Sequence, residues 1–141
     1  MHTSTIVSAI LGIAITLLTL DLLWLKFAMG PIFRAELGDW VRPNIGVVPA
    51  ALFYVFYVVG IYVFAVRPAL VSSAPLAYAI GYGSLLGLVA YGAYDLTNLA
   101  TLRAWTPRLA MIDMAWGTFL TAAASTAGMA AARLIENSAR P

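Results

Sequence analysis

The sequence contains no cysteine, which excludes disulfide bonds, thiolate metal sites and cysteine nucleophiles. Histidine is almost as scarce, since His2 is the single example and lies in the N-terminal tail. A buried haem or a histidine-based metal centre would therefore lack ligands, which leaves only oxygen ligands from aspartates. We expect neither a cofactor nor a metal site.

Charged residues are also few. Only 10% of the 141 residues are charged, against roughly 25% in an ordinary soluble domain. In contrast, 62% are hydrophobic, so most of the chain is suited to a membrane. The eight Lys and Arg residues are scattered and form no run, which gives no support for nucleic-acid binding. The length suits one polytopic membrane domain over residues 1–141.

Four apolar segments approach the roughly 20 residues that a membrane-spanning helix needs. Gly30–Pro31 predicts the end of the first segment and Arg67–Pro68 the end of the second, because proline lacks the helical N–H donor. Thr106–Pro107 predicts an N-cap and first turn for the last. The predicted helices are 5–29, 45–66, 76–102 and 107–134. The connections are short, and we expect an all-α, antiparallel four-helix transmembrane bundle.

Three aspartates, Asp21, Asp95 and Asp113, lie inside these apolar segments. A carboxylate at the bilayer centre costs about 2.5–3.5 kcal/mol on insertion scales, so it normally faces the bundle interior and marks a functional site. Asp21 and Asp95 come late in helices that run the same way, and Asp113 comes two turns into a helix that runs back. These positions and helix directions predict that all three aspartates converge in one leaflet.

The third predicted helix carries the clearest polar pattern, because Ser84, Tyr91, Asp95 and Asn98 recur at spacings that share one face. Asp95 with Asn98 one turn later could accept, donate and orient a ligand. The simpler interpretation is that Asp95 only hydrogen-bonds neighbouring helices.

Asp113 has two interpretations as well. Carboxyl groups that share a dry pocket cannot all ionise, so one of them would hold a proton and could act as an acid. Alternatively, Asp113 forms a structural ion pair with Arg103 or Arg108.

Aromatic residues are concentrated in the second and third helices and at the acidic end of the bundle. Those of the second helix, facing Tyr91 and Tyr94, favour an aromatic-lined cavity, although lipid-facing or core positions are commoner: Phe53, Tyr54, Phe56, Tyr57 and Tyr62. The four tryptophans all fall at the end that carries the aspartates, as in an interfacial belt: Trp24, Trp40, Trp105 and Trp116. Gly83 and Gly87 form a small-residue step that predicts close helix packing within a bundle or a dimer.

Longer motifs strengthen the membrane assignment. The stretch Tyr91-Gly-Ala-Tyr-Asp-Leu-Thr-Asn98, the later Asp113-Met-Ala-Trp-Gly117 and the early Asp21-Leu-Leu-Trp24 carry a family resemblance. On these motifs the chain resembles a bacterial family of small four-helix membrane proteins catalogued only as a domain of unknown function. The resemblance spans essentially the whole chain and implies a bacterial inner-membrane location and a polytopic fold. It implies no established activity, substrate or cofactor.

These patterns favour a buried acidic site that binds, or processes by acid–base chemistry, an apolar or lipid-like small molecule. In this hypothesis Asp95, Asp113 and Asp21 are the catalytic candidates. The candidates for substrate binding are Asn98, Tyr91, Tyr94, Trp24 and Trp116. Two alternatives remain open: a small proton- or cation-coupled transporter, or a non-catalytic accessory subunit of a membrane complex.

The expected partners are membrane lipids and the apolar ligand, with a homodimer left open. Basic residues are more numerous at the acidic end than at the other: Lys26, Arg34, Arg42, Arg103 and Arg108 against Arg67, Arg133 and Arg140. The positive-inside rule then places the acidic end in the cytoplasm.

Overall fold

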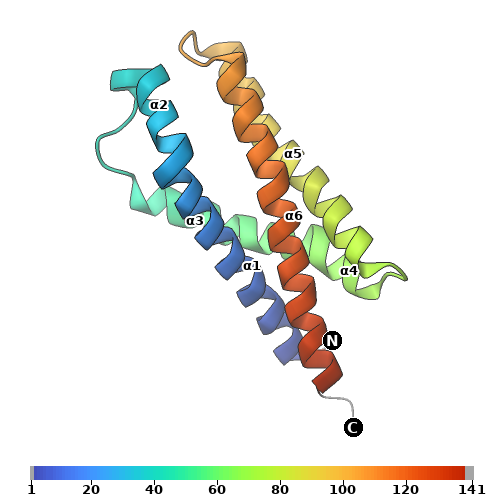
Figure 1. Ribbon diagram of the computed structural model, residues 1–141. Coiled ribbons are helices and arrows are strands. Elements are labelled where there is room, and N and C mark those ends of the chain that lie inside the picture. The colour runs from blue at the N-terminus through green and yellow to red at the C-terminus, as the bar shows by residue number, and fades with distance from the viewer. Residues whose placement is uncertain (1, 139–141) are drawn as a thin grey trace.

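A computed structural model describes residues 2–138, which form an all-α bundle (Figure 1). Within these residues there is no β-strand, and four helical segments are long and apolar enough to cross a membrane. The segments are Thr3–Trp40, Val47–Val71, Pro75–Thr101 and Pro107–Ser138. The predicted all-α membrane bundle is confirmed.

The first span is longer than predicted. It consists of α1 (Thr3–Trp24), the π-helical segment η1 (Leu25–Met29), α2 (Gly30–Leu37) and the short 3₁₀ turn η2 (Gly38–Trp40). The prediction of a helix over 5–29 that ends at Gly30–Pro31 is therefore wrong, since Gly30 is itself helical with φ −60° and ψ −46°. Asp21 consequently lies near the middle of this helical segment instead of near its end.

The second span also continues through its proline. It consists of α3 (Val47–Ile61), the π-helical segment η3 (Tyr62–Val66) and α4 (Arg67–Val71). The prediction that the helix over 45–66 stops at Arg67–Pro68 is therefore also wrong, since α4 continues directly from η3.

One wide turn in each of the two spans explains these errors. The N–H of Gly30 bonds the carbonyl of Leu25, and the N–H of Arg67 bonds that of Tyr62, so each bond spans five residues where an α-helix spans four. The wider turn stands directly before a proline, which lacks an N–H and whose ring would clash with the carbonyl four residues back. The π turn absorbs both defects, and the helix continues.

The third and fourth spans follow the prediction closely. They are α5 (Pro75–Thr101) and α6 (Pro107–Ser138), against predictions of 76–102 and 107–134. Thr106 caps α6 as expected, because its hydroxyl oxygen accepts the Leu109 N–H at 3.2 Å.

Helix α6 is the centre of the bundle and packs along both α1 and α5 (Figure 1). Small residues permit this close approach. A Cβ at Gly83 or Gly87 of α5 would overlap α6, and one at Gly128 of α6 would overlap Ile13 of α1. Gly83 and Gly87 thus allow close helix packing within this chain, which is the first of the two predicted roles, bundle or dimer contact.

Helices α1 and α5 run in the same direction and α6 runs back, while α3 crosses the bundle at an incline (Figure 1). Helix α5 meets the second span mainly through η3 and α4, and α3 diverges from it toward the acidic end. The main apolar core lies where these spans meet and includes Ile13, Leu17, Ile61 and Leu120, each fully buried.

Candidate functional site

The three aspartates come from three helices and are all buried. Asp21 on α1 is 6% exposed, Asp95 on α5 is 0% exposed and Asp113 on α6 is 7% exposed. Asp95 and Asp113 are immediate neighbours, and Asp21 lies within electrostatic range of Asp113. The carboxyl groups therefore gather in one region of the bundle.

Asp21 is held by two donors from other helices. The Tyr54 hydroxyl on α3 donates to Oδ2 at 2.7 Å, and the Trp116 indole N–H on α6 donates to Oδ1 at 3.0 Å. Both oxygens thus accept a hydrogen bond, which suits the ionised form of the carboxyl group. Lys26, the nearest basic residue in sequence, is exposed and lies over the Phe27 ring instead.

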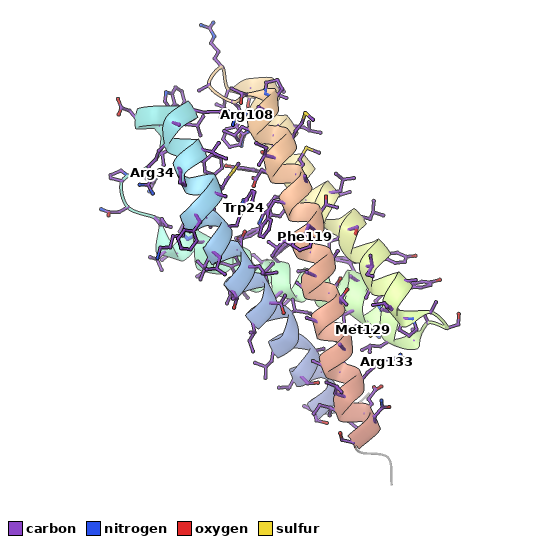
Figure 2. The ribbon with its side chains drawn as sticks, viewed as in Figure 1. Trp24, Arg34, Arg108, Phe119, Met129 and Arg133 are labelled. Carbon is purple, nitrogen blue, oxygen red and sulfur yellow. The ribbon has the colours of Figure 1, made fainter. Side chains whose placement is uncertain are left out.

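The tryptophans do not form the predicted interfacial belt. Trp24 and Trp116 stack between α1 and α6 with ring centroids 4.4 Å apart and planes within 7° (Figure 2 shows Trp24 there). Trp105 is buried at 7% exposure, and only Trp40, at 74%, is freely exposed. The belt prediction is wrong for Trp24, Trp105 and Trp116, because their indole rings pack against the buried acidic region. The Trp116 N–H also donates a hydrogen bond to it.

Asp95 is sealed inside the bundle. Neither of its carboxylate oxygens has a hydrogen-bond partner among the described residues, and the nearby Trp105 Nε1 is also buried without one. Asp95 faces Trp105 and Asp113. Asp95 is not among the described residues that line the cavity beside Asp113, so it lies behind Asp113 as seen from that cavity.

Asp113 is buried and lines a cavity. The predicted alternative of an ion pair with Arg103 or Arg108 is not observed, because the ion pair found within residues 2–138 joins Arg108 to Glu36 at 3.4 Å. The same Glu36 accepts the Thr106 hydroxyl, which ties α2 to the start of α6. Arg108 therefore lies at the end of the bundle (Figure 2) and leaves the Asp113 carboxyl with another carboxyl group, Asp95, as its polar neighbour.

A cavity of about 450 Å³ opens beside Asp113. All four spans contribute to it, and five of its ten lining residues are aromatic: Asp21, Leu25, Phe33, Ala50, Phe53, Tyr54, Ala90, Tyr91, Tyr94 and Asp113. Phe53 and Tyr94 are 45% and 52% exposed, so they form the rim through which the cavity reaches the bundle surface. Phe53 belongs to α3 and Tyr94 to α5, and α3 diverges from α5 toward this end of the bundle (Figure 1).

The predicted site residues divide into two groups. Asp21, Asp113, Tyr91 and Tyr94 line the cavity, whereas Asp95 and the remaining candidates do not. Trp116 acts from outside through Asp21, and Trp24 through its stack on Trp116. The structure places Asn98 away from the cavity wall, one turn beyond Asp95 on α5. Of the predicted aromatic residues, Phe53, Tyr54, Tyr91 and Tyr94 line the cavity, whereas Phe56 faces outward at 71% exposure and neither Tyr57 nor Tyr62 lies in its wall.

Gly117 fixes the position of the Tyr91 ring. A Cβ on Gly117 would overlap that ring, so the ring lies directly against the α6 backbone. Any larger residue would displace Tyr91 toward the cavity. The glycine is therefore a structural requirement of the cavity wall.

The sequence predicted Tyr54 only as one of several aromatic residues of the cavity, and it did not predict Phe33 or Gly117 as part of the site. Tyr54 stood among five aromatic residues of one span, and no spacing rule distinguishes the one that faces Asp21. Phe33 was placed in a loop, because the helix was expected to end at Pro31. Gly117 belongs to the Asp-x-x-Trp-Gly motif, which was the one available signal.

Comparison with protein families gives a match over most of the chain. A family model described as "Predicted membrane protein (DUF2177)" matches residues 6–130. No curated protein and no solved structure matches the chain significantly.

Proposed function

The chain belongs to this DUF2177 family of predicted membrane proteins, and from that premise we propose that it binds a lipid-like small molecule inside the membrane. The bound molecule would occupy the cavity between the four spans, with its apolar part against the aromatic wall. Its polar end would meet the Asp113 carboxyl.

The observation that carries this proposal is a nearly buried carboxyl group in the wall of a ligand-sized apolar cavity. Small-molecule pockets measure roughly 300–1,000 Å³, are mostly apolar and contain a few placed polar groups. The cavity of about 450 Å³ has that size and composition. An ionisable group this far inside a membrane protein is costly, which supports a function for it.

The three aspartates would take different roles. Asp113 contacts the ligand, Asp21 supplies a fixed negative charge, and Asp95 acts behind Asp113 as a positioning residue. Two adjacent carboxyl groups in a water-poor site share one proton more readily than they ionise together. Such a pair can transfer a proton to or from a bound molecule, so acid–base processing is the natural extension of binding.

Transport receives less support than binding. Beyond the cavity, the fully buried residues Ile13, Leu17 and Leu120 fill the bundle with apolar side chains. A proton or cation path to the opposite end would have to cross this region. An accessory role, in turn, would not require a cavity.

The bacterial inner membrane is the location that this proposal assumes. A multi-pass membrane protein fits the four candidate spans. Access from the lipid phase through the rim at Phe53 and Tyr94 would suit a ligand that partitions into the bilayer.

Filling the cavity is the direct experiment. Ala90 lines the cavity, whereas Ala93, one turn along the same helix, faces outward. Protein purified in mild detergent would be extracted and its lipids compared by mass spectrometry. A lipid-like molecule enriched in the wild type and in Ala93→Phe, but absent from Ala90→Phe, is expected. Equal lipid content in all three folded proteins would overturn the proposal.

A further inference from the structure

The charges around the cavity do not balance. Two carboxyl groups line it and a third stands directly behind, yet no Lys or Arg among residues 2–138 pairs with any of them. Arg108 is engaged by Glu36, and Lys26 and Arg34 are exposed. A buried negative charge is normally paired or hydrogen-bonded, because its desolvation is expensive.

Asp21 and Asp113 are satisfied to different degrees. Asp21 has a donor on each oxygen, so its negative charge is stabilised in place. Asp113 is more than nine-tenths buried, lines the cavity and receives no hydrogen bond from a described Lys, Arg, Tyr or Trp. Its described polar neighbour is the Asp95 carboxyl group, which can supply at most the one proton that the pair shares, so any further donor has to come from the cavity.

Aromatic side chains complete the surroundings. Tyr91 and Tyr94 of α5 and Phe53 of α3 line the same space as the two carboxyl groups. The negative face of an aromatic ring attracts an ammonium group, and aromatic cages are a known way to bind one. A carboxylate beside such a wall adds the opposite charge. The same wall would repel a carboxylate or a phosphate.

A metal ion fits this site poorly. No group of three or more metal-ligating side chains converges within the described residues. The volume of about 450 Å³ is also far larger than one ion requires and suits an organic molecule.

We infer that the ligand of this cavity is an amphiphilic amine, whose ammonium group contacts Asp113 and whose apolar chain lies along the aromatic wall. This inference rests on the proposed function and names its ligand class. It excludes fatty acids and anionic phospholipids as ligands of the cavity.

The test uses two probes of equal chain length, dodecylamine and dodecanol. Each would be titrated into phosphatidylcholine nanodiscs containing the protein, with empty nanodiscs subtracted, and the heat of binding measured. Dodecylamine should bind the wild type at least about tenfold more tightly than dodecanol. Asp113→Asn should remove most of this preference while dodecanol affinity stays the same.

Asp39→Asn is the matched control, because Asp39 is an exposed acid at the same end and lies outside the cavity. It should leave the preference for the amine intact. The wild-type comparison needs no variant, so a poorly folded Asp113→Asn protein would not obscure the result.

The failures are distinguishable. Equal binding of both probes to the wild type, with both lost in Ala90→Phe, would overturn the amine assignment and retain the cavity as a binding site. Binding of neither probe above the empty nanodiscs would contradict the amine assignment. If the lipid extracts of wild type and Ala90→Phe are then also identical, the proposed function fails with it.

Discussion

Three aspartates that look alike in the sequence have three different surroundings. Asp21 accepts hydrogen bonds from Tyr54 and Trp116, Asp113 faces the cavity, and Asp95 is enclosed without a partner among the described residues. The cost of a carboxylate in lipid predicted correctly that all three are buried. Helical spacing could not predict that Asp21 and Asp113 line the cavity while Asp95 does not, because that depends on how α1 and α5 pack along α6.

Tyr54 offers a test of the charge on Asp21. Tyr54→Phe removes one of the two donors to a buried charged acceptor and should cost about 1.5–3 kcal/mol of stability. Thermal or denaturant unfolding in detergent would measure the loss.

Tyr57→Phe is the matched control. The Thr121 hydroxyl donates to the Gly117 carbonyl at 2.7 Å, so Tyr57 is the donor in its 2.6 Å bond to Thr121. Removing Tyr57 OH breaks a neutral hydrogen bond and should cost only about 0.5–1.5 kcal/mol. An equal loss in the two variants would mean that Asp21 is not held as an anion.

At the scale of the helices, the two π turns are the main departure from the sequence-based prediction. Proline rules work for helices whose hydrogen bonds span four residues, and they predicted ends at Pro31 and Pro68. At Gly30 and Arg67 the backbone N–H bonds the carbonyl five residues back, at Leu25 and Tyr62. No local sequence pattern predicts that this carbonyl will be chosen over the one four residues back. By contrast, Thr106–Pro107 follows a local capping rule, and the start of α6 was predicted to the residue.

Gly30 should be indispensable to the first π turn. A Cβ at this position would overlap the Leu25 carbonyl that closes the turn, so Gly30→Ala should lower the melting temperature. Gly60→Ala on α3 is the control, because a Cβ there has open space. Alanine favours helix by up to about 1 kcal/mol over glycine, so Gly60→Ala should be neutral or stabilising. Similar melting temperatures for the two variants would rule out a requirement for Gly30.

For the whole molecule, the distribution of basic residues predicts that the acidic end faces the cytoplasm. The absence of cysteine makes this measurable with single introduced cysteines. Asp39→Cys at the acidic end should resist a membrane-impermeant maleimide in spheroplasts, whereas Ser73→Cys at the other end should react. Both positions are exposed in the structure. The reverse labelling pattern would invert the topology.

The bundle as a whole was predictable because the apolar length of each span is a local property of the chain. The cavity was only partly predictable. Its aromatic character followed from Phe53, Tyr54, Tyr91 and Tyr94, but its position depends on the incline of α3 away from α5. Phe33 joins the wall only because α2 continues the first span past Pro31.

The central claim is that an apolar molecule enters this cavity and meets the carboxyl group of Asp113. Dicyclohexylcarbodiimide is an apolar reagent for protonated carboxyl groups, and Asp113 would offer one in the ligand-free protein by sharing a proton with Asp95. It tests the claim directly when the modified residue is identified by peptide mass spectrometry. The account predicts modification at Asp113, prevented by Ala90→Phe and unaffected by Ala93→Phe. Modification of the enclosed Asp95 in its place, or equal modification of Asp113 in both alanine variants, would contradict the account.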